Sequence, residues 1–139
     1  MKTQKIKKII YICNHATFFL SHRYNLIELC LKNKISYKLF IGKSASNISE
    51  KKAIAELDKD EINYKQFNFH TSKFNLLYDF FSLLHIFYNI FIYKPSVIHA
   101  ISNKPIIYSI ILSPFIKSKF ILSFSGFGYL YTNNKNNIK

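Results

Sequence analysis

KKIIYICNHATFFLSHRYNLIELCLKNKISYKLFIG, residues Lys7–Gly42, begins and ends with an apolar run. The two runs, Lys7–Cys13 and Ser36–Ile41, are short and rich in isoleucine and aromatic residues. Such runs are typical of strands buried on both faces of a parallel sheet. The segment between them is long enough for a crossover, so this stretch predicts a strand, a helix and a second, parallel strand.

Helical spacing fills the segment between the two runs. Its apolar residues recur at i, i+4, i+7 and i+11, which places them on one face of a helix with Ser21 as the expected N-cap. These residues are Leu20, Tyr24, Ile27 and Leu31.

The rest of the chain repeats the alternation of strand and helix. Three more apolar runs follow: Ile62–Phe67, Ser96–Ala100 and Lys119–Phe124. Expected helices separate them in SEKKAIAELDKD, in Asn75–Tyr93 and from about Pro105 to Ile116. The pattern predicts a doubly wound, Rossmann-like α/β fold: about five parallel strands in the order 3-2-1-4-5, with helices on both faces. One domain, 1–132, and a polar tail, 133–139, are expected.

Charge and cysteine content narrow the class of protein. The chain of 139 residues has a net charge of +13, which favours phosphates or an anionic membrane leaflet, although a genome-wide bias toward A/T-rich codons would also enrich lysine. Cys13 and Cys30 form no C-x-x-C pair, and no histidine completes a zinc site, so we expect reduced thiols and no metal. The basic start resembles a signal peptide, but Asn14 and His15 interrupt its apolar run and no small-residue cleavage site follows, so we expect a first strand. The reduced thiols favour a cytoplasmic protein.

The segment Asn75–Tyr93 is apolar enough to raise the question of a membrane span. Its polar residues fall at steps of four, three, three and four, which aligns them in one narrow stripe of a helix. We therefore expect a helix packed on the sheet, with that stripe in water or among lipid headgroups. The stripe consists of Asn75, Asp79, Ser82, His85 and Asn89.

Three polar segments follow strands whose carboxyl ends meet at the switch point of such a sheet. NHATFFLSHR follows the first strand, HAISNKP the fourth and SGFGYLYT the fifth. Standard signatures are absent: there is no complete dinucleotide fingerprint, no P-loop lysine motif and no spacing for a catalytic triad. The acidic pair Asp58 and Asp60 reads as a solvated helix end.

These segments resemble family 4 glycosyltransferases of the GT-B fold. NHATFFLSHRYNLIELCLKNKISYKLFIG is similar to their first strand, loop and helix, where an S-H-R triplet starts the helix. HAISNKPIIYSII is similar to their H-x-x-x-x-K-P stretch, and FSGFGYLYT to their glycine loop. The resemblance covers Lys7 to Thr132. It implies the acceptor-side half of a retaining sugar transferase, apparently truncated, with the nucleotide-sugar domain missing.

The resemblance also implies site residues and partners. A lipid-linked or polysaccharide acceptor would bind Asn14, His15, Ser21, His22, Arg23, His99 and Lys104, while Ser125, Gly126 and Gly128 would form a glycine loop near the donor phosphates. A nucleotide-sugar would be the donor substrate, with no cofactor and no metal. The expected partners are an anionic membrane surface and a donor domain in the same or another chain, which places the protein on the inner face of the cell membrane.

Arg23 is the only arginine beside nineteen lysines. Its guanidinium can bind a phosphate or carboxylate with two parallel hydrogen bonds, which an ammonium cannot do, but a salt bridge to a carboxylate such as Glu28, or plain chance, would explain it equally. A non-catalytic, flavodoxin-like module that binds a polyanion or a membrane is the alternative function. No nucleic-acid motif is present, so nucleic acid is not an expected partner.

Overall fold

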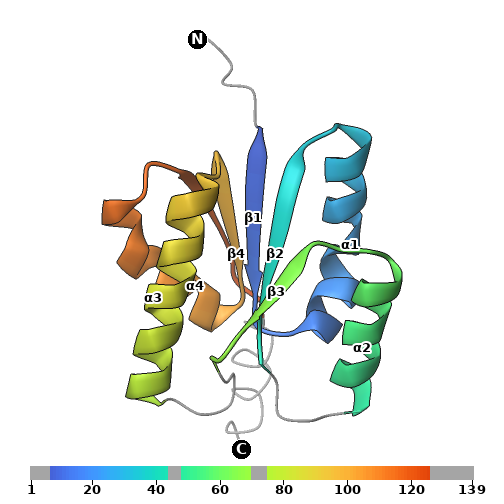
Figure 1. Cartoon of the computed structure of the whole chain (residues 1–139), viewed down its shortest axis with the longest axis horizontal. Coiled ribbons are helices and arrows are strands. Elements are labelled where there is room, and N and C mark those ends of the chain that lie inside the picture. The colour runs from blue at the N-terminus through green and yellow to red at the C-terminus, as the bar shows by residue number, and fades with distance from the viewer. Residues whose placement is uncertain (1–6, 44–47, 70–74, 126–139) are drawn as a thin grey trace, which may run out of the picture.

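The computed structural model describes residues 7–43, 48–69 and 75–125. Five parallel strands form one sheet in the order β3-β2-β1-β4-β5 (Figure 1). The predicted Rossmann-like α/β sheet and its strand order are therefore confirmed. The strands are β1 (Lys8–Cys13), β2 (Ser36–Gly42), β3 (Tyr64–Phe67), β4 (Val97–Ile101) and β5 (Lys119–Ser123).

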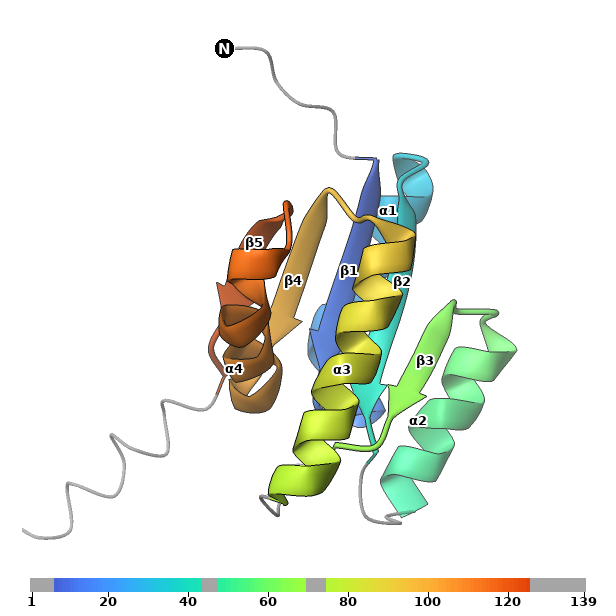
Figure 2. The ribbon, with the colours of Figure 1, turned by 60° about the vertical axis from the view of Figure 1, so that its left-hand side comes forward.

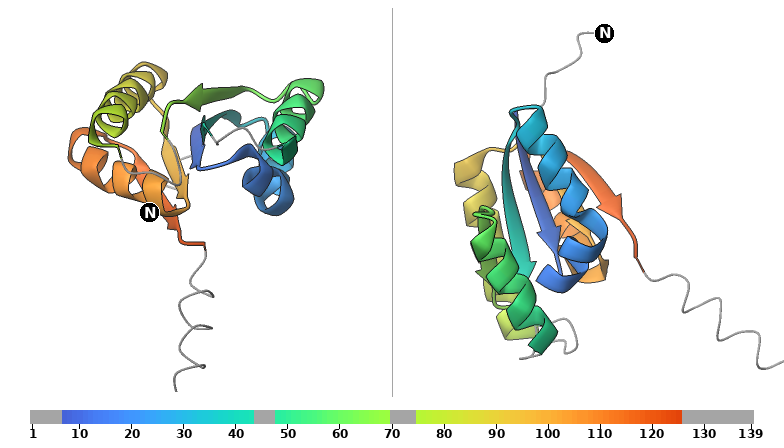
Figure 3. Two further views of the ribbon diagram at one scale, coloured as in Figure 1. Left: turned by 90° about the horizontal axis from the view of Figure 1, so that it is seen from below. Right: turned by 90° about the vertical axis from the view of Figure 1, so that its right-hand side faces the viewer.

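Helices cover both faces of the sheet, as Figure 3 shows from below. One face carries α1 (Ala16–Lys32) and α2 (Ile48–Lys59). The other carries α3 (Leu76–Tyr93), α4 (Asn103–Leu112) and the short 3-10 helix η1 (Ser113–Phe115). Figure 2 shows α3 in front of the sheet and α4 beside β4 and β5.

β1 is the central strand, and every residue of it except Lys8 is buried. Tyr11 and Cys13 face the core under α1 and α2, whereas Ile10 and Ile12 face the core under α3 and α4. Because both faces of β1 are covered, its sequence is an unbroken apolar run instead of an alternating one. Burial also raises the pKa of the Cys13 thiol to about 11, although hydrogen bonds oppose this shift, so the thiol stays protonated at neutral pH.

α3 packs on the sheet through a stripe made of Asp79, Ser82, Ile86 and Ile90, all of them buried. The sequence places the polar stripe of this helix in water or among headgroups, and for Asp79 and Ser82 that prediction is wrong. The reason is a partner on α4 that local sequence does not reveal: Lys104 binds the Asp79 carboxylate inside the domain.

The outer face of α3 is apolar. Phe81, Tyr88 and Phe91 are each more than half exposed. Among the residues described, α3 is the one helix long and apolar enough to cross a membrane by length and composition, with a mean hydropathy of 1.4. Only 22% of its residues are buried in the domain. The helix is thus attached to the sheet by a narrow stripe and leaves most of its surface uncovered.

The loops that follow β1, β2 and β3 close on one another at Gly42. A Cβ atom at this position would lie 2.7 Å from the carbonyl oxygen of Asn14 and 2.8 Å from Cδ2 of Phe69. Phe69 is fully buried, and its ring meets that of Tyr108 edge-on at a centroid distance of 5.4 Å. The missing side chain of Gly42 therefore lets the carboxyl edge of the sheet pack tightly.

We predict that Gly42→Ala lowers the free energy of unfolding by about 1–3 kcal/mol, because the new methyl group overpacks against backbone and a buried ring. Urea denaturation followed by circular dichroism measures the change. Ser36→Ala, at the exposed opposite end of the same strand, is the control and should change stability by less than about 0.5 kcal/mol. Equal stability of the two variants would contradict the close packing around Gly42.

Candidate functional site

The connection from β1 to α1 consists of only Asn14 and His15. α1 begins at Ala16, with His15 in an extended conformation at its N-cap. The expected cap at Ser21 is therefore wrong. Ser21 lies in the second turn, where its hydroxyl donates to the carbonyl of Thr17 at 2.8 Å. The predicted helix begins near Leu20, the first residue of the apolar repeat seen in the sequence. In the structure the buried face of the helix begins earlier, at Ala16 and Phe19.

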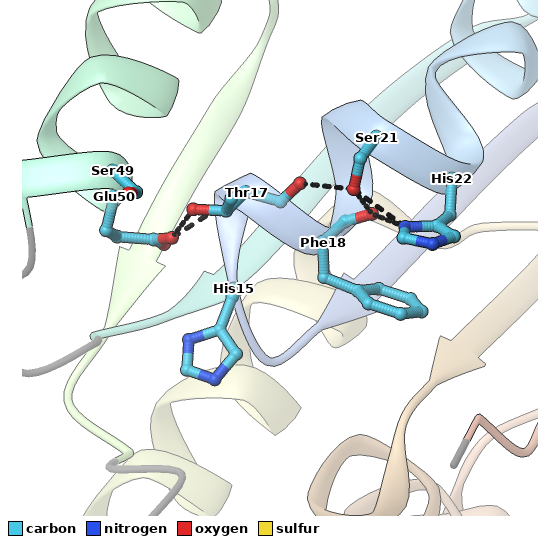
Figure 4. A pocket seen from close by; sticks show the side chains of 7 residues that line it. All are labelled: His15, Thr17, Phe18, Ser21, His22, Ser49 and Glu50. Atoms are coloured by element: carbon cyan, nitrogen blue, oxygen red, sulfur yellow. Dashed lines mark hydrogen bonds between the residues drawn. The ribbon is translucent and has the colours of Figure 1, made fainter. Parts of the chain in front are cut away.

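The amino end of α1 is capped by Glu50, which belongs to α2. The backbone amides of Ala16 and Thr17 donate to the two Glu50 carboxylate oxygens at 2.7 and 3.1 Å, and the Thr17 hydroxyl donates to the same group (Figure 4). Glu50 is buried. A helix amino end attracts anions, and here the protein supplies that anion itself. Arg23 lies two turns further on, so this amino end does not help it bind a phosphate.

A cleft of about 340 Å³ opens beside this cap. Figure 4 shows that Glu50 and Thr17 lie on one side of α1, whereas the rings of Phe18 and His22 lie on the other. The Ser21 hydroxyl and Nδ1 of His22 are 2.7 Å apart, and the His22 ring stacks on Phe18 at a centroid distance of 4.6 Å. Three predicted site residues thus come together in this cleft, which is lined by His15, Thr17, Phe18, Ser21, His22, Ser49 and Glu50.

His99 lies on the same face of the sheet, two residues before the end of β4. Its Nε2 is 2.7 Å from the Ser123 hydroxyl on β5, and its ring contacts Tyr11 at a centroid distance of 5.7 Å. Burial lowers the pKa of His99, and the positive charge of Arg23 lowers it further. At neutral pH the imidazole is therefore uncharged, so it can both accept and donate a hydrogen bond.

Arg23 is half-buried, close enough to His99 to affect its titration. Its Nη1 donates to the carbonyl of His22 at 3.2 Å. The salt bridge to Glu28 that would have explained this arginine does not form, and among the described residues no carboxylate pairs with it. Among the described residues, the carbonyl of His22 is the one hydrogen-bond partner of its guanidinium.

Lys104 lies on the opposite face of the sheet from Arg23 and His99. Its Nζ is buried and donates to the Asp79 carboxylate at 2.7 and 3.0 Å, while the Tyr108 hydroxyl donates to the same group at 2.5 Å. The negative charge of Asp79 therefore neutralises the positive charge of Lys104 inside the protein. The role of Lys104 as a phosphate ligand stays a prediction.

Ser102 follows β4, which borders the switch point between β1 and β4, and joins the end of β4 to the end of β5. Its φ of 80° lies in the region that favours glycine, which is backbone strain of the kind concentrated at functional sites. Its amide donates to the carbonyl of Ser123 at 3.1 Å, and its hydroxyl accepts from Ser125 at 3.3 Å. Ser125 is thus held at this edge, whereas Gly126 and Gly128 lie outside the described residues.

Asn14 also lies at this edge of the sheet, and its side-chain oxygen is buried without a hydrogen-bond partner among the described residues.

The described part of the chain contains no group of three or more metal-ligating side chains. Hydroxyl, imidazole and guanidinium groups beside α1 form an arrangement suited to hydrogen-bonding sugar hydroxyls and phosphate oxygens.

Sequence reasoning missed Glu50, Ser102 and Ser123. Glu50 reads as one charge in a solvated helix, and its partners are more than thirty positions away. The sequence does not indicate Ser102, because a serine can adopt many backbone conformations and its residue type does not predict a strained one. Ser123 is signalled only by its place at the end of a predicted strand whose carboxyl edge belongs to the switch point.

A solved structure with this fold is a glycosyltransferase from Rickettsia africae ESF-5. It superposes with a TM-score of 0.59 over 86% of this chain, at 14% sequence identity, and the chain spans about 30% of the length of that protein. No family model matches the sequence, and a search of curated proteins gives no match. The likeness shows a glycosyltransferase-like fold.

We predict that Glu50→Gln destabilises the protein by about 1–2 kcal/mol, because a neutral amide satisfies the amino end of α1 less well than a carboxylate. Thermal and urea unfolding measure the loss. Glu56→Gln removes the same charge from an exposed position of α2 and should be nearly neutral. Equal effects of the two variants would show that net charge, not the cap, is responsible.

We further predict that Asp79→Asn costs about 3–5 kcal/mol, because Lys104 is left as an uncompensated buried charge. A double variant, Asp79→Asn with Lys104→Gln, should recover part of this loss, and a double-mutant cycle measures the coupling. Additive losses would contradict a strong interaction between the two side chains.

The pH dependence of stability has a defined sign at this pair. Burial alone would raise the pKa of Asp79, but hydrogen bonds from Lys104 and Tyr108 outweigh burial and lower it below its ordinary value. The folded state therefore binds the proton less readily than the unfolded state. The stability from this group is present above the unfolded pKa of about 3.9 and is lost as the pH falls through the folded pKa.

Proposed function

We propose that this chain is the acceptor-binding half of a retaining glycosyltransferase, which transfers a sugar from a nucleotide-sugar to a lipid-linked or polysaccharide acceptor. One observation carries the proposal: Ser21 and His22 line a cleft on α1, and Arg23 of the same helix affects the pKa of His99, in a fold that matches part of a glycosyltransferase. Resemblance to the family 4 enzymes supports the finer assignment.

Two of these groups, His99 and Arg23, have defined roles in the proposed reaction. Neutral His99, oriented by Ser123, accepts a hydrogen bond from the acceptor hydroxyl, and Arg23 grips a phosphate of a lipid-linked acceptor through two donors. The bond from the sugar to the nucleotide diphosphate breaks, a bond to the acceptor oxygen forms, and the hydroxyl proton passes to the departing diphosphate. Positioning and stabilisation of that diphosphate supply the acceleration, with no metal required.

A donor domain, in the same protein or in a partner chain, completes the proposed enzyme by binding the nucleotide-sugar. The glycine loop that contains Gly126 and Gly128 would face the donor phosphates. We place the enzyme on the cytoplasmic face of the cell membrane, where lipid-linked acceptors are available to a peripheral protein. The 139 residues alone are expected to transfer no sugar, because the groups that bind the leaving diphosphate are mostly on the donor side.

A non-catalytic module that binds a membrane surface is the second candidate. The exposed apolar face of α3 and the net charge of +13 favour it. Fusion to a donor domain of a related transferase separates the two functions. Sugar transfer by the fusion supports the enzyme, whereas membrane binding without any affinity for a lipid-linked sugar supports the module. Salt-sensitive binding to random DNA would revive a nucleic-acid partner as a third possibility.

We predict that Arg23→Lys weakens binding of a short-chain polyprenyl-diphosphate sugar by about 1–3 kcal/mol and leaves folding almost unchanged, because lysine keeps the charge but not the two-pronged geometry. Binding is followed by the imidazole NMR signals of His99 and His22. Arg23→Gln should bind more weakly still, whereas Lys32→Gln removes the same charge from the exposed end of α1 and serves as the control. If the two glutamine variants lost the same amount of binding affinity, Arg23 would contribute only as one of many surface charges.

A further inference from the structure

The exposed apolar residues of this protein are concentrated on one side. Nineteen large hydrophobic residues are exposed among the described residues, and nine of them lie on α3 and four on α4 and η1. A groove of about 250 Å³ joins the two helices and has an entirely apolar lining, namely Leu83, Leu84, Phe87, Ile111, Leu112 and Phe115. We call the outer side of α3, α4 and η1 the α3–α4 surface. A continuous apolar patch on this scale marks an interaction site.

The α3–α4 surface carries no exposed charge within these three helices. Asp79 and Lys104 are their only charged residues, and both are buried against each other. The pairing keeps both charges off the outer side, which is therefore apolar apart from a few polar side chains such as His85. Such a surface can enter a hydrocarbon layer without burying an unpaired charge.

Lysines collect at the carboxyl end of α3. The Nζ atoms of Lys8 and Lys38 lie 5.1 and 4.7 Å from the centre of the Tyr93 ring, and Lys94 is the C-cap of the helix. Lys65 donates to Asn89 of the last turns at 3.0 Å. An apolar surface bordered by lysines and tyrosines matches the boundary between lipid tails and anionic headgroups.

We propose that the α3–α4 surface docks on an anionic lipid bilayer, with the outer faces of α3 and α4 in the acyl-chain boundary and the lysines at the end of α3 among the headgroups. The inference deepens the membrane location in the proposed function by naming the surface and its orientation. It requires no sugar transfer. α1, with Arg23, lies on the opposite face of the sheet and stays in water.

Charge distinguishes the bilayer from the other possible occupants. A second copy of the chain would bring a second net charge of +13 close to the first, and like charges oppose that association. A donor domain would meet the carboxyl edge of the sheet, where ligands of this fold class bind, and not the outer face of α3. Anionic lipid complements both the apolar face and the lysines beside it.

Two charge-matched pairs of substitutions test the surface. Leu77→Glu with Phe91→Glu places two acids on the outer face of α3, whereas Leu29→Glu with Leu31→Glu places two acids on exposed positions of α1. Both pairs change the net charge equally. Affinity of the full chain is measured by co-sedimentation with vesicles of equimolar phosphatidylglycerol and phosphatidylcholine.

The α3 pair should weaken vesicle binding by about tenfold or more, because it removes apolar contact and places acids in the boundary. The α1 pair should weaken it by less than about threefold, because α1 faces away and salt screens charges beyond roughly 10 Å. Vesicles of phosphatidylcholine alone should bind the unaltered chain weakly, and carbonate should release it from anionic vesicles. Equal losses in the two pairs would overturn the proposal.

Fluorescence gives a second measurement that does not depend on a disruptive change. The chain has no tryptophan, so Phe81→Trp and Leu31→Trp each introduce a single reporter at positions that are 65% and 61% exposed. Vesicles should shift the emission of the first variant to shorter wavelength, and brominated lipid should quench it, while the second stays unchanged. A shift only in the second variant would overturn the docking surface.

Other occupants would give different results. A dimer in the absence of lipid, seen by analytical ultracentrifugation and abolished by the α3 pair, would assign the surface to a second copy. Retention of the chain in vesicles after carbonate would assign α3 to a membrane span. Because vesicle binding involves no sugar, failure of glycosyl transfer leaves the inference intact, and failure of vesicle binding leaves the acceptor site to be tested separately.

Discussion

The buried ion pair between Asp79 and Lys104 determines how α3 and α4 face the sheet. Each charge would cost several kcal/mol if it were buried alone, so the two helices are held in the rotation that brings them together. Tyr108 adds a third hydrogen-bonding group from the same helix as Lys104. With Asp79 turned inward, Phe81, Tyr88 and Phe91 of the same helix face outward. A single polar contact thus sets both the packing of one core and the character of one outer surface.

Strand order follows from patterns that a short window of sequence contains. Apolar runs the length of a strand, separated by helical spacing, leave few arrangements of a parallel sheet, and β1 is recognisable as the strand covered on both faces. The start of α1 does not follow from such a window. Its amino end is satisfied by Glu50, a residue of the next helix, so the local search for a capping hydroxyl pointed to Ser21 instead.

The polar stripe of α3 is a second feature that local sequence predicts only in part. Its periodicity was recognisable, but the direction in which it faces depends on Lys104, twenty-five positions after Asp79. In the candidate site, His22 and Arg23 are singled out by the S-H-R triplet of the family resemblance, and His99 by its place on a strand next to the switch point. Their roles in binding stay predictions. Ser123 and the strained backbone of Ser102 depend on how β4 and β5 meet, which only the assembled sheet specifies.

The central position of β1 imposes an order on synthesis. β1 leaves the ribosome well before β4, one of its two neighbours, which follows only after the whole of α3. Until then the nascent chain has an unpaired strand edge, a long apolar helix and an aspartate that awaits its lysine. Chains in this state are prone to aggregation, and pairing across distant segments is slow. The interval between the emergence of Asp79 and that of Lys104 is therefore the vulnerable period of this fold, and any factor that shields α3 during it would raise the yield of folded protein.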